Sequence, residues 1–311
     1  MYYKISKENF EKNILTNLKN KGLNLFFFEE KLIDNLNKDF TTLKFKYFNS
    51  NRDLFTLFTS GSTGIPKGIV HSSGGYMVAT KFTCKKLFGM KKNSVIITAS
   101  NAGWLNGHTY ALFGPLSLGA TTILLEDPML VLDENLLKKI LKLKVSILYL
   151  PVTIIRLMKS LFKNKKFKTS YLKTLGSMGE HLAPSVAEWF AKTFTNKNNS
   201  IVNAYYQTEN GAIIFSPTYK DKTSKIPHGS VGKPSAKFLK INNMHLDKKK
   251  EIKLITPWPG NMKRIINGKK EWKKYWDKNG HFRMFDLGTM KNNNLYVHGR
   301  NDDVINVRGH R

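Results

Sequence analysis

Short apolar runs alternate with helical patterns through the middle of the chain, and this alternation limits the fold more than any other feature of the sequence. The runs typical of strands are 54–59, 95–99, 121–126, 146–150 and 171–177. Between them lie segments with helical patterns, at 75–88, near 108–118, from Asp133 and from Pro151. Parallel strands need crossover connections, usually helices that cover both faces of the sheet. The alternation therefore predicts an α/β fold with parallel strands flanked by helices.

The character of the sequence changes at two points, which divide the chain into three predicted parts. Residues 1–52 are rich in Lys and Asn and are expected to be peripheral. Residues 53–223 carry the alternation and form the predicted α/β core. After about Ser224 the segments become shorter and less helical, with Gly/Pro turns between them. We therefore expect 224–311 to form a smaller β-rich subdomain.

Composition excludes several classes of protein. The chain has 311 residues, of which 41% are hydrophobic, so it can bury a core and is unlike a disordered protein. Cys84 is the single cysteine. This excludes a disulfide framework and a Cys-rich zinc site, and we interpret Cys84 as a small buried apolar residue. The sequence has no apolar run as long as a signal-peptide core or a membrane span, which predicts a cytoplasmic protein with no membrane partner.

The chain is strongly basic. Lys and Arg number 51 against 22 Asp and Glu, which gives a formal net charge of +29. Such an excess raises the alternative of a nucleic-acid-binding protein. However, the sequence contains no recognisable nucleic-acid module, and the lysines are scattered rather than gathered in one stripe. This alternative therefore ranks last.

A loop rich in glycine and hydroxyl residues follows the first apolar run. It reads Thr59-Ser-Gly-Ser-Thr-Gly-Ile-Pro-Lys-Gly68. Its glycines let the backbone approach a ligand closely, its hydroxyls donate hydrogen bonds, and its lysine adds a cation. It is not a Walker A loop, because the spacing differs and neither Ser nor Thr follows the lysine. We interpret it as a polyphosphate site made by Thr59, Ser60, Gly61, Ser62, Thr63, Gly64 and Lys67.

This loop resembles the signature phosphate loop of the AMP-forming acyl-CoA synthetases, members of the adenylate-forming superfamily. Further motifs narrow the resemblance to the acetyl-CoA and propionyl-CoA synthetase branch. They follow that branch's order, as GIVHSSGGY (68–76), NAGWLNGHTYALFGPLSLGATTILLEDP (101–128), LGSMGEHLAP (175–184), YYQTENG (205–211) and HGRNDDVINVRGHR (298–311). The resemblance extends from about Asp53 to Arg311. It implies the large-domain core of the adenylate-forming fold, without the C-terminal lid domain.

The resemblance implies catalytic roles at the phosphates of ATP. Thr208 would hydrogen-bond the α-phosphate, and Glu209 would hold the Mg²⁺ that neutralises the phosphate charge. Arg311 matches an arginine that contacts the α-phosphate. Asp302 matches the hinge about which the lid domain rotates between the two half-reactions.

The resemblance also implies a site for the adenosine part of the nucleotide. The adenine would lie against Gly179, Glu180 and His181, and His181 stands where the family usually has proline. The ribose hydroxyls would bind Asp286, with Arg300 reaching the same sugar. A carboxylate suits this task because its two oxygens match two hydroxyl donors.

Five residues fall where this branch builds its acyl pocket. They are Trp104, Leu105, Asn106, Met178 and Tyr206. The acetate enzymes usually have tryptophan at the position of Tyr206 and smaller side chains at those of Leu105 and Asn106. The resemblance therefore implies a short-chain carboxylate substrate, either acetate or propionate.

The implied reaction has two steps. A carboxylate attacks ATP to give acyl-AMP and pyrophosphate, and the thiol of coenzyme A then displaces AMP. The family continues past Arg311 into a lid domain that carries a lysine for the first step, and it has a long segment with no counterpart before Asp53. A separate polypeptide supplying these parts is one expectation, and an inactive nucleotide-binding fragment is the alternative.

Overall fold

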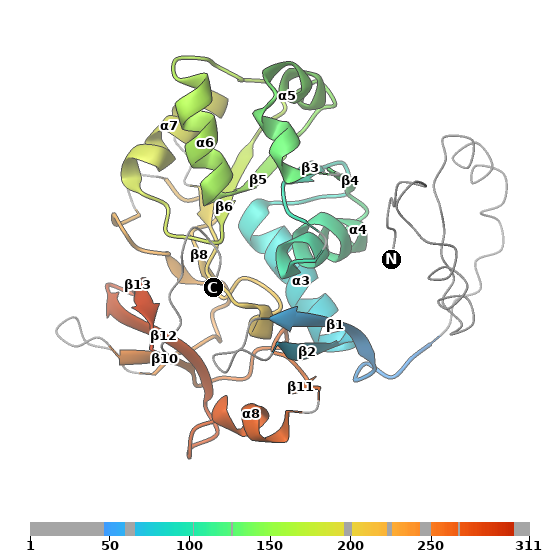
Figure 1. The fold of residues 1–311 in the computed structure, drawn as a ribbon, viewed down its shortest axis with the longest axis vertical. Helices are drawn as coiled ribbons and strands as arrows, with labels where there is room; N and C mark the ends of the chain where they lie inside the picture. The colour runs from blue at the N-terminus through green and yellow to red at the C-terminus, as the bar shows by residue number, and fades with distance from the viewer. Residues whose placement is uncertain are drawn as a thin grey trace. The chain divides into compact units, whose positions relative to one another are not determined.

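The computed structural model describes residues 47–59, 66–101, 103–125, 127–195, 201–222, 226–242, 250–266 and 268–301. The described residues from Asn49 onward belong to one compact unit (Figure 1). The predicted peripheral segment 1–52 lies mostly outside the described residues. The boundary predicted near residue 224 stays a prediction.

Among the described residues, five strands form a wholly parallel sheet in the order β4-β3-β5-β6-β7. Their bounds are β3 (Val95–Thr98), β4 (Thr121–Ile123), β5 (Ile147–Pro151), β6 (Thr174–Met178) and β7 (Val202–Asn203). Every strand predicted between 95 and 177 is present, with shorter bounds for the runs at 121–126 and 171–177. The predicted α/β class is therefore confirmed.

Helices cover both faces of this sheet. One face packs against α5 (Glu134–Leu141), α6 (Val152–Phe162) and α7 (Pro184–Phe194), which lie together at the top of Figure 1. The other face packs against α3 (Ser73–Phe88) and the π-helix η2 (Gly107–Phe113), which continues into α4 (Gly114–Ser117). Neighbouring residues of β5 alternate between the faces, because strand side chains point to opposite sides.

Local sequence explains where these helices begin and end. The Asp133 carboxylate caps α5 by accepting a hydrogen bond from the Leu136 amide at 2.9 Å. Pro184 occupies the first turn of α7, where its missing N–H costs nothing. Gly89 ends α3 with a φ of 66°, in the left-handed region that glycine adopts readily. Cys84 is buried within α3, as predicted, and burial raises the pKa of its thiol.

A small antiparallel sheet precedes α3, and here the sequence prediction was incomplete. We expected a strand, the phosphate loop and then the helix. Instead the loop joins two antiparallel strands, β1 (Asp53–Thr59) and β2 (Lys67–Ser72), and β11 (Arg264–Ile265) pairs with β2 from the other side. The apolar part of β2 is short and runs directly into the helix without a turn. The sequence pattern therefore did not distinguish β2 from the start of the helix.

The last third of the described chain is rich in antiparallel strands. β10 (Lys250–Leu254), β12 (Phe282–Lys291) and β13 (Asn294–Arg300) form one sheet, and β8 (Phe215–Ser216) pairs with β9 (Lys233–Pro234). The short helix α8 (Lys269–Lys274) precedes β12 (Figure 1). A separate apolar cluster, including Phe215, Ile252 and Met284, packs these elements together. Within the described residues, we find no helix with the length and apolarity to cross a membrane.

Candidate functional site

The two ends of the predicted phosphate loop lie side by side. Thr59 ends β1 and Lys67 begins β2, and the two residues are paired across the hairpin. The hydroxyl oxygen of Thr59 is buried and has no hydrogen-bond partner in the described part of the chain. Five predicted phosphate-binding residues lie outside the described residues, namely Ser60, Gly61, Ser62, Thr63 and Gly64. The hairpin itself therefore fixes where the loop begins and ends.

The second predicted motif, residues 205–211, forms a turn that leaves the parallel sheet after β7. Its middle is the 3-10 turn Thr208–Asn210. The amide of Met262 donates to the Glu209 carbonyl at 2.7 Å. Gly211 has a φ of 70°, and a Cβ there would lie 2.5 Å from the Gly260 carbonyl oxygen. Only glycine fits this position, so Gly211 allows the turn to pack against the 258–262 segment.

His71, on β2, supports this turn from within the core. Its Nε2 lies 2.7 Å from the carbonyl oxygen of Thr208. A carbonyl only accepts, so Nε2 carries the proton and donates. The ring is fully buried, and burial lowers the pKa of His71 to about 4. His71 is therefore neutral at pH 7 and holds the Thr208 backbone in place.

Lys67 and Glu209 meet through a third residue. The Lys67 ammonium donates to the hydroxyl of Tyr275 at 3.1 Å, and that hydroxyl donates to Glu209 Oε1 at 2.7 Å. Glu209 is only 2% exposed. The structure thus brings together the lysine at the end of the phosphate loop and the carboxylate predicted to hold Mg²⁺. Both side chains converge on one tyrosine hydroxyl.

Asp286, on β12, lies next to the same 205–211 turn. Its Oδ2 accepts hydrogen bonds from the Tyr205 hydroxyl and from Gln207 Nε2, both at 2.6 Å. Arg300, on β13, approaches its Oδ1 at 3.3 Å. Gln207 also donates to the Met284 carbonyl at 2.7 Å. The predicted ribose residues Asp286 and Arg300 are therefore paired, and two residues of the turn orient the carboxylate.

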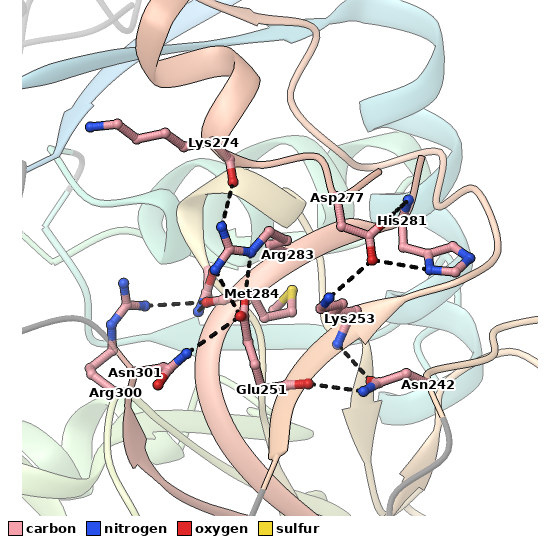
Figure 2. Close-up of polar contacts among 11 residues, drawn as sticks. Asn242, Glu251, Lys253, Lys274, Asp277, His281, Arg283, Met284, Arg300 and Asn301 are labelled. Carbon is pink, nitrogen blue, oxygen red and sulfur yellow. Dashed lines mark hydrogen bonds and ion pairs between the residues drawn. The ribbon is translucent and has the colours of Figure 1, made fainter. Parts of the chain in front are cut away.

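A polar network extends from this point along β10 and β12 (Figure 2). Glu251 binds Arg283 in a bidentate pair, with both N–O distances at 2.8 Å. Asn301 donates to the Glu251 carboxylate at 3.4 Å. Lys253, also on β10, donates to the Asp277 carboxylate at 3.0 Å. The backbone N–H of His281 donates to the same carboxylate. Hydrogen bonds from the His281 backbone and Lys253 hold the pKa of Asp277 well below its usual range.

The predicted adenine segment follows β6. Gly179 has a φ of 89°, and among the described residues beyond its chain neighbours no atom lies within 4 Å of where a Cβ would be, so the space beside it is open. Glu180 pairs with Arg156 of α6 at 2.7 Å, and Arg156 also reaches the His181 carbonyl at 3.4 Å. The second oxygen of Glu180 is buried and has no partner among the described residues. An accessible glycine backbone beside an anchored carboxylate is compatible with a flat ring, and the adenine role stays a prediction.

Three of the other four predicted acyl-pocket residues lie around Tyr206. The Tyr206 hydroxyl donates to Asn106 Oδ1, and its ring packs against the clusters that contain Leu105 and Met178. Burial raises the pKa of Tyr206 well above its usual range, so the hydroxyl is protonated. Trp104 lies just before this group, and its side chain is 54% exposed. Their role as a pocket stays a prediction.

Sequence reasoning missed three residues that organise the site. His71 lies in the motif 68–76 and Gln207 in the motif 205–211, but their roles depend on contacts with distant segments. Tyr275 carried no signal, since its partner Lys67 is 208 positions away. Asp302 and Arg311 lie outside the described residues.

Comparison with known proteins identifies a family and several relatives. The family described as AMP-binding enzyme matches residues 20–247. Acetyl-coenzyme A synthetase 2 of Saccharomyces cerevisiae is 34% identical over 275 residues, covering 83% of this chain and 40% of that protein. The Kluyveromyces lactis protein of the same name is 33% identical over 85% of this chain. Acetyl-coenzyme A synthetase of Vibrio parahaemolyticus is 33% identical over 83% of this chain.

These matches cover most of this chain but less than half of each relative. The chain spans about 40% of the length of the curated relatives it matches. The family match includes the phosphate loop, the adenine segment and the 205–211 turn. Lys67, Gly179, Glu180, Glu209 and Gly211 of these segments lie in one compact unit. The chain therefore belongs to the AMP-binding enzyme family, and the relatives to which it is similar here are acetyl-coenzyme A synthetases.

Proposed function

We propose that this chain carries the nucleotide-binding and acyl-activating site of an AMP-forming acid–thiol ligase. Its reaction would activate acetate or propionate with ATP and transfer the acyl group to coenzyme A. The observation that carries the proposal is the meeting of Lys67, Glu209 and Asp286 around the 205–211 turn. One cation and two buried carboxylates from three distant segments suit phosphates, a metal and a ribose.

The residues present fit one Mg²⁺. Glu209 offers a buried carboxylate, the hard oxygen ligand that Mg²⁺ prefers. No cluster of three His, Cys, Asp or Glu side chains able to hold a metal occurs in the residues that the structure describes. In phosphate chemistry, Mg²⁺ usually binds one or two carboxylates, and substrate phosphates and water complete its coordination. Bound there, the ion would neutralise charge on the phosphates.

In the first step, an oxygen of the carboxylate substrate bonds to the α-phosphorus and the bond to pyrophosphate breaks. Such a transfer needs positioning and charge stabilisation more than a protein nucleophile. Lys67 would balance phosphate charge, and Thr208 would hydrogen-bond the α-phosphate. Asp286 would hold the ribose hydroxyls so that the α-phosphate stays in line. Arg311 would add a further α-phosphate contact.

In the second step, the thiol of coenzyme A attacks the acyl carbonyl and AMP leaves. The acyl group would sit among Trp104, Leu105, Asn106, Met178 and Tyr206. A methylene group changes discrimination by about 1–3 kcal/mol, so acetate and propionate would differ modestly. The Asn106–Tyr206 hydrogen bond supports a fixed wall for this pocket.

A further proposal concerns the partner and the location. A separate polypeptide would supply a lid domain with its lysine, and the reaction would take place in the cytoplasm. The alternative is a nucleotide-binding fragment without activity.

ATP–pyrophosphate exchange tests these proposals. The chain would be assayed with acetate, propionate and butyrate, alone and with an added lid domain from a related enzyme. We expect exchange with acetate or propionate once the lid is supplied. ATP binding without exchange in either setting would overturn the ligase proposal and favour the binding fragment.

A further inference from the structure

We infer that Tyr275 is a positioning residue that sets the distance and orientation between the phosphate-loop lysine and the metal-binding carboxylate. The inference rests on the proposed function, because it concerns how Lys67 and Glu209 bind a metal–nucleotide complex. Tyr275 touches neither reacting atom. It acts through the two side chains that it joins.

The two hydrogen bonds that join Lys67, Tyr275 and Glu209 form a bridge, and the bridge has a defined direction. The Tyr275 hydroxyl accepts from the Lys67 ammonium and donates its single proton to Glu209 Oε1. A cation at one end and a carboxylate at the other polarise the hydroxyl in the same sense, so each hydrogen bond strengthens the other. The hydrogen bond at Oε1 also limits rotation of the carboxylate and so fixes the direction of Oε2. The Lys67 ammonium lies 5.3 Å from the centre of the Tyr275 ring, close enough for a cation–π attraction.

Tyr275 is held rigidly in its own place. It is 3% exposed, and its ring packs against Phe282 at 5.6 Å and edge-on against Phe285 at 5.1 Å between centres. The backbone of Arg283 donates to the Tyr275 carbonyl at 2.8 Å. The hydroxyl therefore has little freedom to follow Lys67 or Glu209 if either moves.

The Glu251–Arg283 pair, drawn in Figure 2, reinforces this arrangement through Phe285. The Arg283 guanidinium lies 4.6 Å from the centre of the Phe285 ring and donates to the Lys274 carbonyl at 3.3 Å. Glu251 fixes that guanidinium through two hydrogen bonds. Phe285 has a φ of 54°, a conformation that a bulky residue keeps only where its surroundings enforce it. The chain Glu251, Arg283, Phe285 and Tyr275 thus links β10 to Glu209.

Replacing Tyr275 by Phe tests the bridge, because it removes the hydroxyl and keeps the ring. Calorimetry would measure the affinity for ATP in Mg²⁺ and in EDTA, and the affinity for AMP in EDTA. Side chains that orient metal ligands typically contribute 10–100-fold in metal affinity, so we expect Tyr275→Phe to lose roughly that factor for ATP in Mg²⁺. AMP binding in EDTA should stay unchanged, which a general structural defect would not allow.

Tyr171→Phe is the matched control, because Tyr171 lies before β6 with 47% of its surface exposed. It should bind all ligands like the wild type. A Tyr275→Phe variant with wild-type ATP affinity in Mg²⁺ would overturn the inference alone. A wild-type chain that binds neither AMP nor ATP would overturn the proposed nucleotide site, and the inference with it.

A second variant tests the support of the bridge. Arg283→Gln removes the guanidinium that packs on Phe285, and it leaves the side chains of Lys67, Tyr275 and Glu209 unchanged. We expect a smaller loss of ATP affinity in Mg²⁺ than for Tyr275→Phe, again with AMP binding retained. If Tyr275→Phe fails to fold, this variant becomes the test, and unchanged ATP affinity in Mg²⁺ would contradict the positioning role.

Discussion

The two main sheets of this protein are stabilised in opposite ways. The parallel sheet of β3 to β7 has no charged residue in any strand, and helices cover both of its faces. The antiparallel sheet of β10, β12 and β13 carries Glu251, Lys253, Arg283, Asp286 and Arg300 in its strands. A strand buried on both faces cannot hold a charge without a large desolvation cost, whereas an antiparallel sheet can keep one polar face.

The difference divides the work between the two regions. Apolar packing makes the parallel sheet a rigid frame, and the antiparallel sheet carries the paired charges of Asp286 and Arg300, where we propose that the ribose binds. The 205–211 turn joins them, because it leaves the parallel sheet after β7 and bonds to Asp286 on β12. Substitutions that remove side-chain volume should therefore destabilise the parallel sheet most. Substitutions that remove a charge should affect the antiparallel sheet most.

The largest effect is expected in the parallel-sheet core. Phe190 of α7 is fully buried and packs edge-on against Phe194 at 5.3 Å. Phe190→Ala should lower the free energy of unfolding by about 3–5 kcal/mol through lost contacts and a cavity. Urea unfolding followed by circular dichroism measures this. Phe238→Ala is the matched control, because Phe238 is 51% exposed, and an equal loss there would contradict the comparison.

The stability of the protein should depend on pH through His71, which holds the 205–211 turn between the two sheets. Its folded-state pKa is about 4 against an ordinary value of 6.5, so between these values the unfolded chain binds a proton that the folded chain does not. Stability present above pH 6.5 should therefore be lost as the pH falls toward 4, by about 3 kcal/mol at 1.36 kcal/mol for each pH unit.

Urea unfolding at a series of pH values checks this, with His71→Gln compared against the wild type. The variant should lose the part of the slope that His71 causes. His181→Gln is the control, because the same substitution is made at an exposed histidine instead of a buried one. A His71→Gln variant with the full wild-type slope would show that other groups cause the acid sensitivity.

A moderate effect is expected at Asp286. Asp286→Asn keeps the shape but removes the charge that faces Arg300, and it places an amide donor among the donors that now bond to the carboxylate. We expect a loss of about 1–3 kcal/mol in the free energy of unfolding and weaker AMP binding. Asp133→Asn is the matched control, since asparagine caps a helix as well as aspartate. Equal effects at the two sites would argue against a special role for Asp286.

The smallest effect is expected for an exposed pair on the parallel-sheet side. Glu188 and Lys192 of α7 lie 2.6 Å apart and are mostly exposed to solvent. Glu188→Gln should not change the unfolding midpoint measurably, because water screens such pairs. A clear shift that vanishes at high salt would mean that surface charge also stabilises this region.

Several features of the protein were predictable from local sequence. The parallel strands and their crossovers follow from apolar runs and helical periodicity, which are properties of neighbouring residues. The α/β class, the buried Cys84 and the phosphate loop's place after β1 could be predicted for the same reason. β2 was missed because its apolar run is too short to stand apart from the helix after it.

The site depended on contacts between residues far apart in the chain. Thr208, Glu209, Asp286 and Arg300 could be named from motifs, but their pairing could not. Tyr275 gave no signal at all, because a tyrosine in a Lys-rich segment looks the same whether it is exposed or buried between a lysine and a carboxylate. Only packing against Phe282 and Phe285 reveals its place.

The sequence by itself determined the class of fold, the order of its elements and the residue types available for nucleotide chemistry. The tertiary structure decided which charges meet: Lys67 with Glu209 through Tyr275, Asp286 with Arg300, and His71 with Thr208. The physical reason is one of range. Backbone propensity and side-chain periodicity act over a few residues, whereas the desolvation and pairing of buried charges depend on segments up to 208 positions apart.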